Sequence, residues 1–417
     1  MREFNVALLT VGLLVLLVGL ASGYLQRRSI LSEPLVALTV GCALGPLGFG
    51  LLRPQGWGNP FAILEEVTRL TLALSLISTA LRLPRHYLRR HWRPLAVMLG
   101  VVLPLSWLVV GGLGILLGFS PLLALLIGAV AAPTDPVLAG AIVSGETAQR
   151  NIPGRVRHLL SAESGANDGL AYPLALLPIL LLHRPVPAAF REWLLHVVLW
   201  EVVGAAGLGA LLGWLAGHVR CLMRPGRVDE LDLTSVGAFA FVVLAGTKLL
   251  GMDGVFAVFV AGVTLRATQP QLKETQGTQE ALNRFFVLPV FALLGLLLPW
   301  REWTELGWCG GALALGALLV RRLPFLLALR PGLSPLHRSR DAWLLGWFGP
   351  IGVGALFYAT LGLRETGSRV PWTVGSLFVV TSIVLHGLSA TPLTHAFGHA
   401  EKRSRASAPQ SGAGDQS

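Results

Sequence analysis

Ionisable side chains are concentrated in one otherwise apolar stretch, LLSAESGANDGLAYP at residues 159–173. It contains Glu163 and Asp168, together with Ser164 and Asn167. A charged side chain inside a hydrocarbon layer costs several kcal/mol unless it is paired or faces water, so each such residue is a functional candidate by default. The stretch therefore predicts a buried polar site in a membrane protein.

Helix geometry separates the two acids of this stretch. At about 100° per residue, Ser164 and Asp168 share one helix face, whereas Glu163 and Asp168 are roughly 140° apart. A later apolar run carries two adjacent arginines, Arg321 and Arg322. The economical arrangement pairs Glu163 with one of them as an internal ion pair and leaves Asp168 unpaired; either arginine can be the partner.

A further acid lies in a second apolar segment, AAPTDPVLAG, which contains Thr134 and Asp135. An unpaired carboxylate among hydroxyls and free carbonyls suits a hard cation such as Na⁺, so we expect Asp168 to bind that cation. Thr134 is either a cap or a further ligand of the cation. Asp168 could instead be a packing residue hydrogen-bonded across the bundle. Asp135 is either part of the cation and proton site or a cap on a half-helix that begins near Pro136.

The bulk composition explains why these charges stand out. Of 417 residues, 53% are hydrophobic and only 13% are charged, against about a quarter charged in soluble domains. Apolar runs of about 20 residues recur almost throughout the chain, as in a polytopic membrane protein. The net charge of +11 reflects arginines in short loops between these runs, so we expect a lipid bilayer and no nucleic acid as partner.

The fold class expected is all-α, with about thirteen transmembrane helices. Most of the 33 Lys and Arg residues fall on one side if the N-terminus is outside, so the C-terminus is predicted to be cytoplasmic, in the cell (inner) membrane. Residues 1–399 are expected to form the membrane domain and residues 400–417 a disordered tail. The predicted spans are 5–25, 30–51, 61–82, 94–117, 119–145, 157–182, 192–219, 231–250, 252–267, 284–300, 304–329, 341–363 and 371–393.

Two of these spans contain prolines that should interrupt them. The fifth has Pro133 and Pro136, and the twelfth has Pro350 in GWFGPIGVGA. Proline removes a backbone donor and clashes with the preceding turn, so both helices should break inside the membrane. Broken helices at matching positions in two six-helix halves indicate inverted repeats with a site at the midplane.

Other charged residues within the spans have structural interpretations. Glu65 and Arg69 are four residues apart and are expected to neutralise each other. His386 is expected to be a hydrogen-bonded packing residue, although a proton-linked role is the alternative. No phosphate-binding loop or nucleophile motif is present, so we expect transport driven by an ion gradient, with no cofactor and no enzymatic activity.

The segments APTDPVLAGAIV and LSAESGANDGLAYP resemble the bacterial sodium/proton antiporters of the NhaP-like, Asn-Asp type, and GVFAVFVAG, GWFGPIGVGALFYA and SIVLHGLSATPL resemble later signatures of the same family. The resemblance implies the NhaA-like antiporter fold, with core helices at about 94–182 and 304–393, the remaining helices for dimerisation, and a homodimer. It implies that Asp168 binds cation and proton in turn with Thr134 and Ser164. It further implies that Asn167 and Glu163 support the site and that an arginine of the eleventh span pairs with Glu163.

The function expected is therefore exchange of a monovalent cation for H⁺. The cation is Na⁺, or alternatively Li⁺ or K⁺, because a carboxylate and hydroxyls accept all three. Asn167 stands where electrogenic relatives carry an acid, so one titratable group indicates electroneutral exchange. A cation channel, another ion-coupled solute transporter and a membrane-embedded enzyme are the alternatives.

Overall fold

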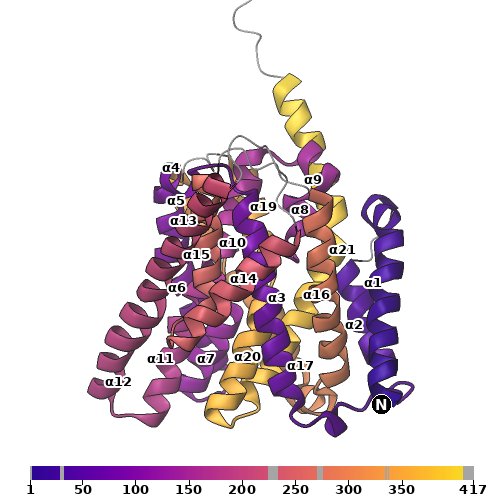
Figure 1. Cartoon of the computed structure of the whole chain (residues 1–417). Coiled ribbons are helices and arrows are strands. Elements are labelled where there is room, and N and C mark those ends of the chain that lie inside the picture. Colours follow the sequence, from indigo (N-terminus) through magenta and orange to yellow (C-terminus); the bar gives the residue numbers. More distant parts are fainter. Residues whose placement is uncertain are drawn as a thin grey trace, which may run out of the picture.

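The computed structural model describes residues 2–28, 32–223, 233–269, 276–333, 336 and 338–406. Every regular element within these ranges is a helix. The helices stand side by side in a bundle, with α1 starting at one end and α21 leaving at the other (Figure 1). The two ends of the described chain therefore lie at opposite ends of the bundle.

Seven helices run without interruption along the bundle. They are α1 (Arg2–Arg28), α2 (Glu33–Leu44), α3 (Pro60–Arg82), α14 (Leu233–Leu249), α15 (Gly254–Thr268), α16 (Gln276–Leu297) and α21 (Val370–Ala406). Short 3₁₀ turns, η1 (Pro54–Trp57) and η4 (Arg330–Gly332), lie in connections between helices.

The other helices follow one another in interrupted runs. The runs are α4 (Tyr87–Arg90), α5 (Trp92–Val97), the π-helical η2 (Met98–Val102) and α6 (Leu103–Leu116); α7 (Pro121–Ala131), α8 (Gly140–Val143) and α9 (Gly145–Asn151); α10 (Gly154–Leu170) and α11 (Tyr172–His183); α12 (Val186–Glu192), the π-helical η3 (Trp193–Gly204) and α13 (Ala205–Met223); α17 (Trp300–Val320) and α18 (Leu323–Leu329); and α19 (Ser339–Trp347) and α20 (Val353–Thr366).

Length and composition suit these helices to a membrane. Six helical runs among the described residues are apolar and long enough to cross one: Glu3–Ala21, Trp92–Leu116, Gly154–His183, Val186–Leu222, Trp300–Gly332 and Val370–Arg403. Five more helices are apolar but shorter, with 10–17 residues each. The all-helical membrane fold is confirmed, and the count of thirteen spans stays a prediction.

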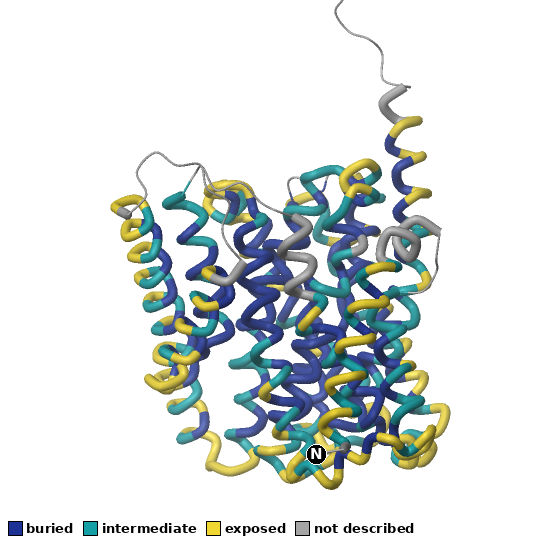
Figure 2. Tube along the Cα trace, turned by 45° about the vertical axis from the view of Figure 1, so that its right-hand side comes forward, coloured by how far each residue is buried: buried dark blue, intermediate teal, exposed yellow. Residues whose placement is uncertain are grey.

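The outer surface of the bundle is itself apolar. Leu8, Leu16 and Leu20 of α1 are 61%, 56% and 76% exposed, and exposed positions line the peripheral helices while buried ones fill the centre (Figure 2). An apolar surface of this extent is stable in lipid but would associate in water. The chain is therefore a multi-pass membrane protein.

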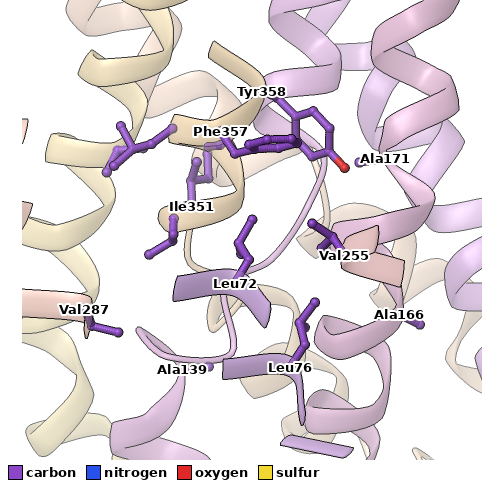
Figure 3. Packing of buried hydrophobic residues seen from close by; sticks show 14 of the residues in the cluster. Leu72, Leu76, Ala139, Ala166, Ala171, Val255, Val287, Ile351, Phe357 and Tyr358 are labelled. Carbon is purple, nitrogen blue, oxygen red and sulfur yellow. The ribbon is translucent and has the colours of Figure 1, made fainter. Parts of the chain in front are cut away.

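The buried centre is organised around α3, which packs against α15, α16 and α20. Figure 3 shows Leu72 and Leu76 of α3 among Val255 of α15 and Ile351, which precedes α20. Leu72 and Leu76 are 2% and 0% exposed. Since they are four residues apart they share one face of α3, which is the face turned toward the broken helix.

Several predicted boundaries differ from the structure. The second predicted span, 30–51, is helical only over Glu33–Leu44, where a turn containing Gly45 and Pro46 follows. The eleventh is interrupted between Val320 and Leu323. The last helix, α21, continues to Ala406, beyond the predicted start of the tail at residue 400, and residues 407–417 lie outside the described residues.

Candidate functional site

The two helix breaks predicted from proline are present, and they meet. Helix α7 ends at Ala131 and α8 starts at Gly140, while α19 ends at Trp347 and α20 starts at Val353. The backbone N–H of Asp135 in the first break donates to the carbonyl of Pro350 in the second, at 2.8 Å. Backbone that is not helical at this depth must be satisfied within the protein, and each break supplies a partner to the other.

Asp135 joins the two breaks through its side chain as well. Its Oδ1 accepts from the backbone N–H groups of Val137 (2.7 Å) and Leu138 (3.3 Å). Its Oδ2 accepts from the N–H of Val353, at 2.6 Å, in the first turn of α20. Both oxygens are thus engaged by backbone amides, which is the geometry of a cap. A direct part for Asp135 in cation or proton binding stays a prediction.

Helix α10 brings three polar side chains to Thr134 in the first break. The hydroxyl of Thr134 lies 3.1 Å from Ser164 Oγ and 3.3 Å from Glu163 Oε2. Asn167 accepts from the backbone N–H of Thr134 at 3.1 Å and donates its Nδ2 protons to Thr134 Oγ1 (2.6 Å) and Glu163 Oε1 (2.7 Å). Asn167 therefore holds the break against α10 with both ends of its amide.

Asp168 differs from its neighbours because its carboxylate has no hydrogen-bond partner. The residue is 1% exposed, and within the described part of the chain neither Oδ1 nor Oδ2 meets a donor. Its backbone carbonyl accepts from the hydroxyl of Tyr358. A buried carboxylate without a partner is costly, so the Asp168 carboxylate needs a bound ion or proton to supply that partner.

The second broken helix approaches Asp168 at a glycine. A Cβ atom added to Gly354, in the first turn of α20, would lie 2.3 Å from Asp168 Oδ1. Any other residue would displace the carboxylate or the helix. This close approach also sets the carboxylate beside the N-terminal end of α20, where the helix dipole favours negative charge.

Arg322, and not Arg321, forms the ion pair with Glu163. Its Nη2 lies 2.9 Å from Glu163 Oε2 and its Nη1 donates to Oε1 at 3.0 Å. Arg321 instead donates to the carbonyls of Ala131, Ala132 (3.4 Å) and Pro133 (3.0 Å), at the end of α7. Cations are favourable at a helix C-terminus, so Arg321 stabilises the half-helix rather than the acid.

A proline in the sequence marks the helix break that separates these arginines. Pro324 follows directly in RRLP, and α18 begins at Leu323 with proline in its first turn. Because Arg321 ends the first helix and Arg322 has non-helical φ and ψ of −135° and −46°, the two side chains take different directions. Tyr358 also contributes to the site and was not predicted, since a single tyrosine in an apolar helix has no distinguishing spacing.

Two other predictions concern Glu65 and His386. The predicted pair of Glu65 with Arg69 is wrong: Arg69 pairs with Glu66, and Glu65 lies 3.0 Å from Arg364 of α20. Spacing along α3 could not reveal a partner from another helix. His386 is hydrogen-bonded as expected for a packing residue, with Nε2 2.9 Å from the carbonyl of Trp347.

Residues 12–396 match the sequence pattern of the family described as "Sodium/hydrogen exchanger, transmembrane". The chain is 31% identical to a Na⁺/H⁺ antiporter of Saccharomyces cerevisiae over 94% of this chain and 43% of that protein. It is 28% identical to the K⁺/H⁺ antiporter NhaP2 of Shewanella oneidensis over 64% of this chain and 46% of that protein. The chain thus spans about half the length of these curated relatives, which come from fungi as well as bacteria.

The fold is also that of a solved antiporter. The sodium proton antiporter MjNhaP1 from Methanocaldococcus jannaschii, solved at pH 8, superposes with a TM-score of 0.73 at 17% identity, covering 95% of this chain and 99% of that one. At this level of identity the likeness establishes the arrangement of helices. The chemistry rests on the residues described above.

Proposed function

Since the chain belongs to the sodium/hydrogen exchanger family, we propose that it exchanges a monovalent cation for H⁺ across a membrane, with the two ions competing for Asp168. The observation that carries this proposal is the buried carboxylate of Asp168, whose two oxygens have no hydrogen-bond partner among the described residues. The hydroxyls of Thr134 and Ser164 adjoin the same helix face, so a cation held by Asp168 finds further oxygen ligands there.

The proposed cycle follows from the cost of a buried charge. An ionised, empty Asp168 is unfavourable in a low dielectric, so the site crosses between the two sides of the membrane only when it is protonated or cation-loaded. Glu163 does not compete for the ion, because Arg322 already neutralises it. Asn167 and Asp135 position the binding residues through their hydrogen bonds.

We infer that the exchange is electroneutral. Asn167 carries no charge, and Asp168 is then the single shuttling acid of the site. One cation moving against one proton transfers no net charge. No ATP, resident metal or cofactor takes part in this cycle, and the chain is proposed to be a transporter rather than an enzyme.

Na⁺ is the proposed substrate, with Li⁺ or K⁺ as alternatives. The named activity of the yeast relative favours Na⁺, and that of the Shewanella relative favours K⁺. A carboxylate and two hydroxyls can bind each of these ions. The chain is further proposed to act as a homodimer in the cell membrane, with helices 94–182 and 304–393 as the moving core, the N-terminus outside and the C-terminus in the cytoplasm.

Flux in proteoliposomes tests the function. With a Na⁺, Li⁺ or K⁺ gradient imposed, the purified protein should drive proton movement in the opposite direction, and Asp168→Asn should abolish that movement. A channel would instead dissipate the cation gradient without moving protons. Normal cation-driven proton flux by Asp168→Asn would contradict the assignment of the site. The matched control is Glu305→Gln, which removes an exposed carboxylate, 62% accessible, from a surface pair with Arg301.

A further inference from the structure

A second group of oxygen-bearing side chains lies about one helical turn from Asp168. Tyr172 follows Asp168 by four residues, and Ala171 between α10 and α11 has helical φ and ψ of −74° and −18°. The helix therefore continues through this point, so Tyr172 lies on the same side as Asp168 and about 6 Å further along the axis.

Asp253 supplies the unsatisfied atom of this group. It caps α15 with Oδ1, which accepts from the N–H groups of Val255 (3.0 Å) and Phe256 (3.4 Å). Its Oδ2 has no hydrogen-bond partner among the described residues, although Asp253 is only 8% exposed. A helix cap needs one carboxylate oxygen, so the second oxygen is left over from the structural role.

Glu201 of η3 adjoins Asp253. The backbone N–H of Asp253 donates to the Glu201 carbonyl at 2.9 Å, and the two carboxylates are near enough to repel each other. The Glu201 side chain is 13% exposed and lies within electrostatic range of the Tyr172 hydroxyl. The basic groups facing the pair are His196, 3.2 Å from Glu201 Oε1, and Lys248; both are exposed. Two poorly solvated carboxylates that repel each other are stabilised by a cation between them.

Tyr358 connects this group to the transport site. Its hydroxyl donates to the backbone carbonyl of Asp168, and Figure 3 shows that hydroxyl beside Ala171. Asp253 and Tyr172 both lie within electrostatic range of Tyr358. The side chains between the two acidic sites are thus the phenols of Tyr172 and Tyr358. Their oxygens can coordinate a cation without adding charge.

We propose that Asp253, Glu201 and Tyr172 form a second, weaker site for the transported monovalent cation, which the ion occupies on its way to or from Asp168. The inference rests on the proposed function, since it takes the same ion as ligand. The donor set is two carboxylates and a phenol, which are hard oxygen ligands suited to Na⁺ or K⁺. Because the site lies on the His183 side of Asp168, it serves only one of the two faces of the membrane.

Equilibrium binding of radioactive sodium to the detergent-purified protein tests the second site directly. Asp168→Asn should still bind Na⁺, with lower affinity than the wild type, and Asp168→Asn combined with Asp253→Asn should bind none. Asparagine keeps an oxygen that can accept from Val255 and Phe256, so the cap survives the substitution. If Asp253→Asn lowers the melting temperature, Asp253→Ser provides a second capping variant that also lacks the spare oxygen.

Flux measurements give the sidedness. In oriented proteoliposomes Asp253→Asn should raise the apparent KM for Na⁺ by about tenfold on one face only, with Vmax retained, because a tenfold change corresponds to the loss of roughly one charged ligand contact. Glu305→Gln should leave the KM on both faces unchanged. An Asp168→Asn protein that binds no Na⁺, or a KM of Asp253→Asn unchanged on both faces, would overturn the second site. Those results leave the proposed exchange standing, which fails only if the wild type moves no protons against a cation.

Discussion

Arg322 and Glu163 form an ion pair inside the bundle, with Nη2 2.9 Å from Oε2 and side-chain exposures of 4% and 5%. The pair joins the break between α17 and α18 to the helix that carries Asp168. Because both charges are removed from water, each depends on the other. The ion pair thereby leaves Asp168 as the acid at the two breaks that has neither an ionic nor a hydrogen-bonded partner among the described residues.

Breaking this pair should cost more stability than neutralising the transport acid. Glu163→Ala strands the Arg322 charge, at about 3–5 kcal/mol, whereas Asp168→Asn removes a carboxylate that makes no hydrogen bond to another described residue. The melting temperature in detergent should therefore fall clearly for Glu163→Ala and little, if at all, for Asp168→Asn. Equal melting temperatures of the two variants would mean that the pair contributes nothing.

The double variants identify the partner of Glu163. Adding Arg322→Ala to Glu163→Ala removes the stranded charge, so the double variant should lose less stability than the two single losses added together. Adding Arg321→Ala to Glu163→Ala removes contacts to the carbonyls of Ala131 and Pro133. The stability losses of these two substitutions should therefore be close to additive. Coupling of Glu163 to Arg321 instead of Arg322 would contradict the geometry.

The site was predictable where local rules apply. Pro133, Pro136 and Pro350 mark the two breaks because proline removes a backbone donor and clashes with the preceding turn, and the separation of Glu163 from Asp168 around α10 follows from helical periodicity alone. These rules were enough to identify the broken helices and to leave Asp168 unpaired.

The rest of the site depends on contacts between helices far apart in the sequence. Val353, whose N–H donates to Asp135, lies in another broken helix. Glu65 pairs with Arg364 of α20 instead of with Arg69 on its own helix. The choice of Arg322 over Arg321 depends on a break of two residues that resets the helical phase. Periodicity within one helix carries no information about any of these contacts.

Gly354 should be required for cation binding. Gly354→Ala places a Cβ 2.3 Å from Asp168 Oδ1, so either the carboxylate or α20 must move. Overpacking of this kind costs about 1–3 kcal/mol, and we expect a raised apparent KM for the cation together with a lower melting temperature. Gly311→Ala in α17 is the matched control, since its Cβ would meet no atom within 4 Å. A normal KM in Gly354→Ala would show that the carboxylate binds the ion elsewhere.

Asp135→Asn should separate a capping role from an ion-binding role. The amide can keep one oxygen for Val137 and Leu138, but its nitrogen cannot accept from the N–H of Val353. An unsatisfied buried group costs about 1–3 kcal/mol, so stability and maximal flux should fall while the number of protons exchanged per cation stays the same. A changed stoichiometry in this variant would make Asp135 a proton carrier.

The stoichiometry itself depends on Asn167. With one shuttling carboxylate, a cation moved in and a proton moved out carry no net charge, and a membrane potential acts only on net charge, at about 2.3 kcal/mol per charge per 100 mV. In vesicles with opposing cation and pH gradients, net flux should vanish when the two gradient ratios are equal. A valinomycin-set potential should not move that point in the wild type. A balance point that shifts with voltage would reveal a second proton carrier, with Asp135 and His386 the first to be tested.

Asn167→Asp provides the converse test, and the hydrogen bonds predict its direction. Asn167 donates to Glu163 Oε1 at 2.7 Å and to Thr134 Oγ1 at 2.6 Å. An ionised aspartate there would face the Glu163 oxygen with no proton to donate, so it restores the bond to Glu163 only by taking up a proton. If that proton is released when the cation binds, each cycle moves one more proton than cation, and the balance point should then depend on voltage. A variant that still exchanges but balances independently of voltage would show that an acid at position 167 does not set the stoichiometry in this chain.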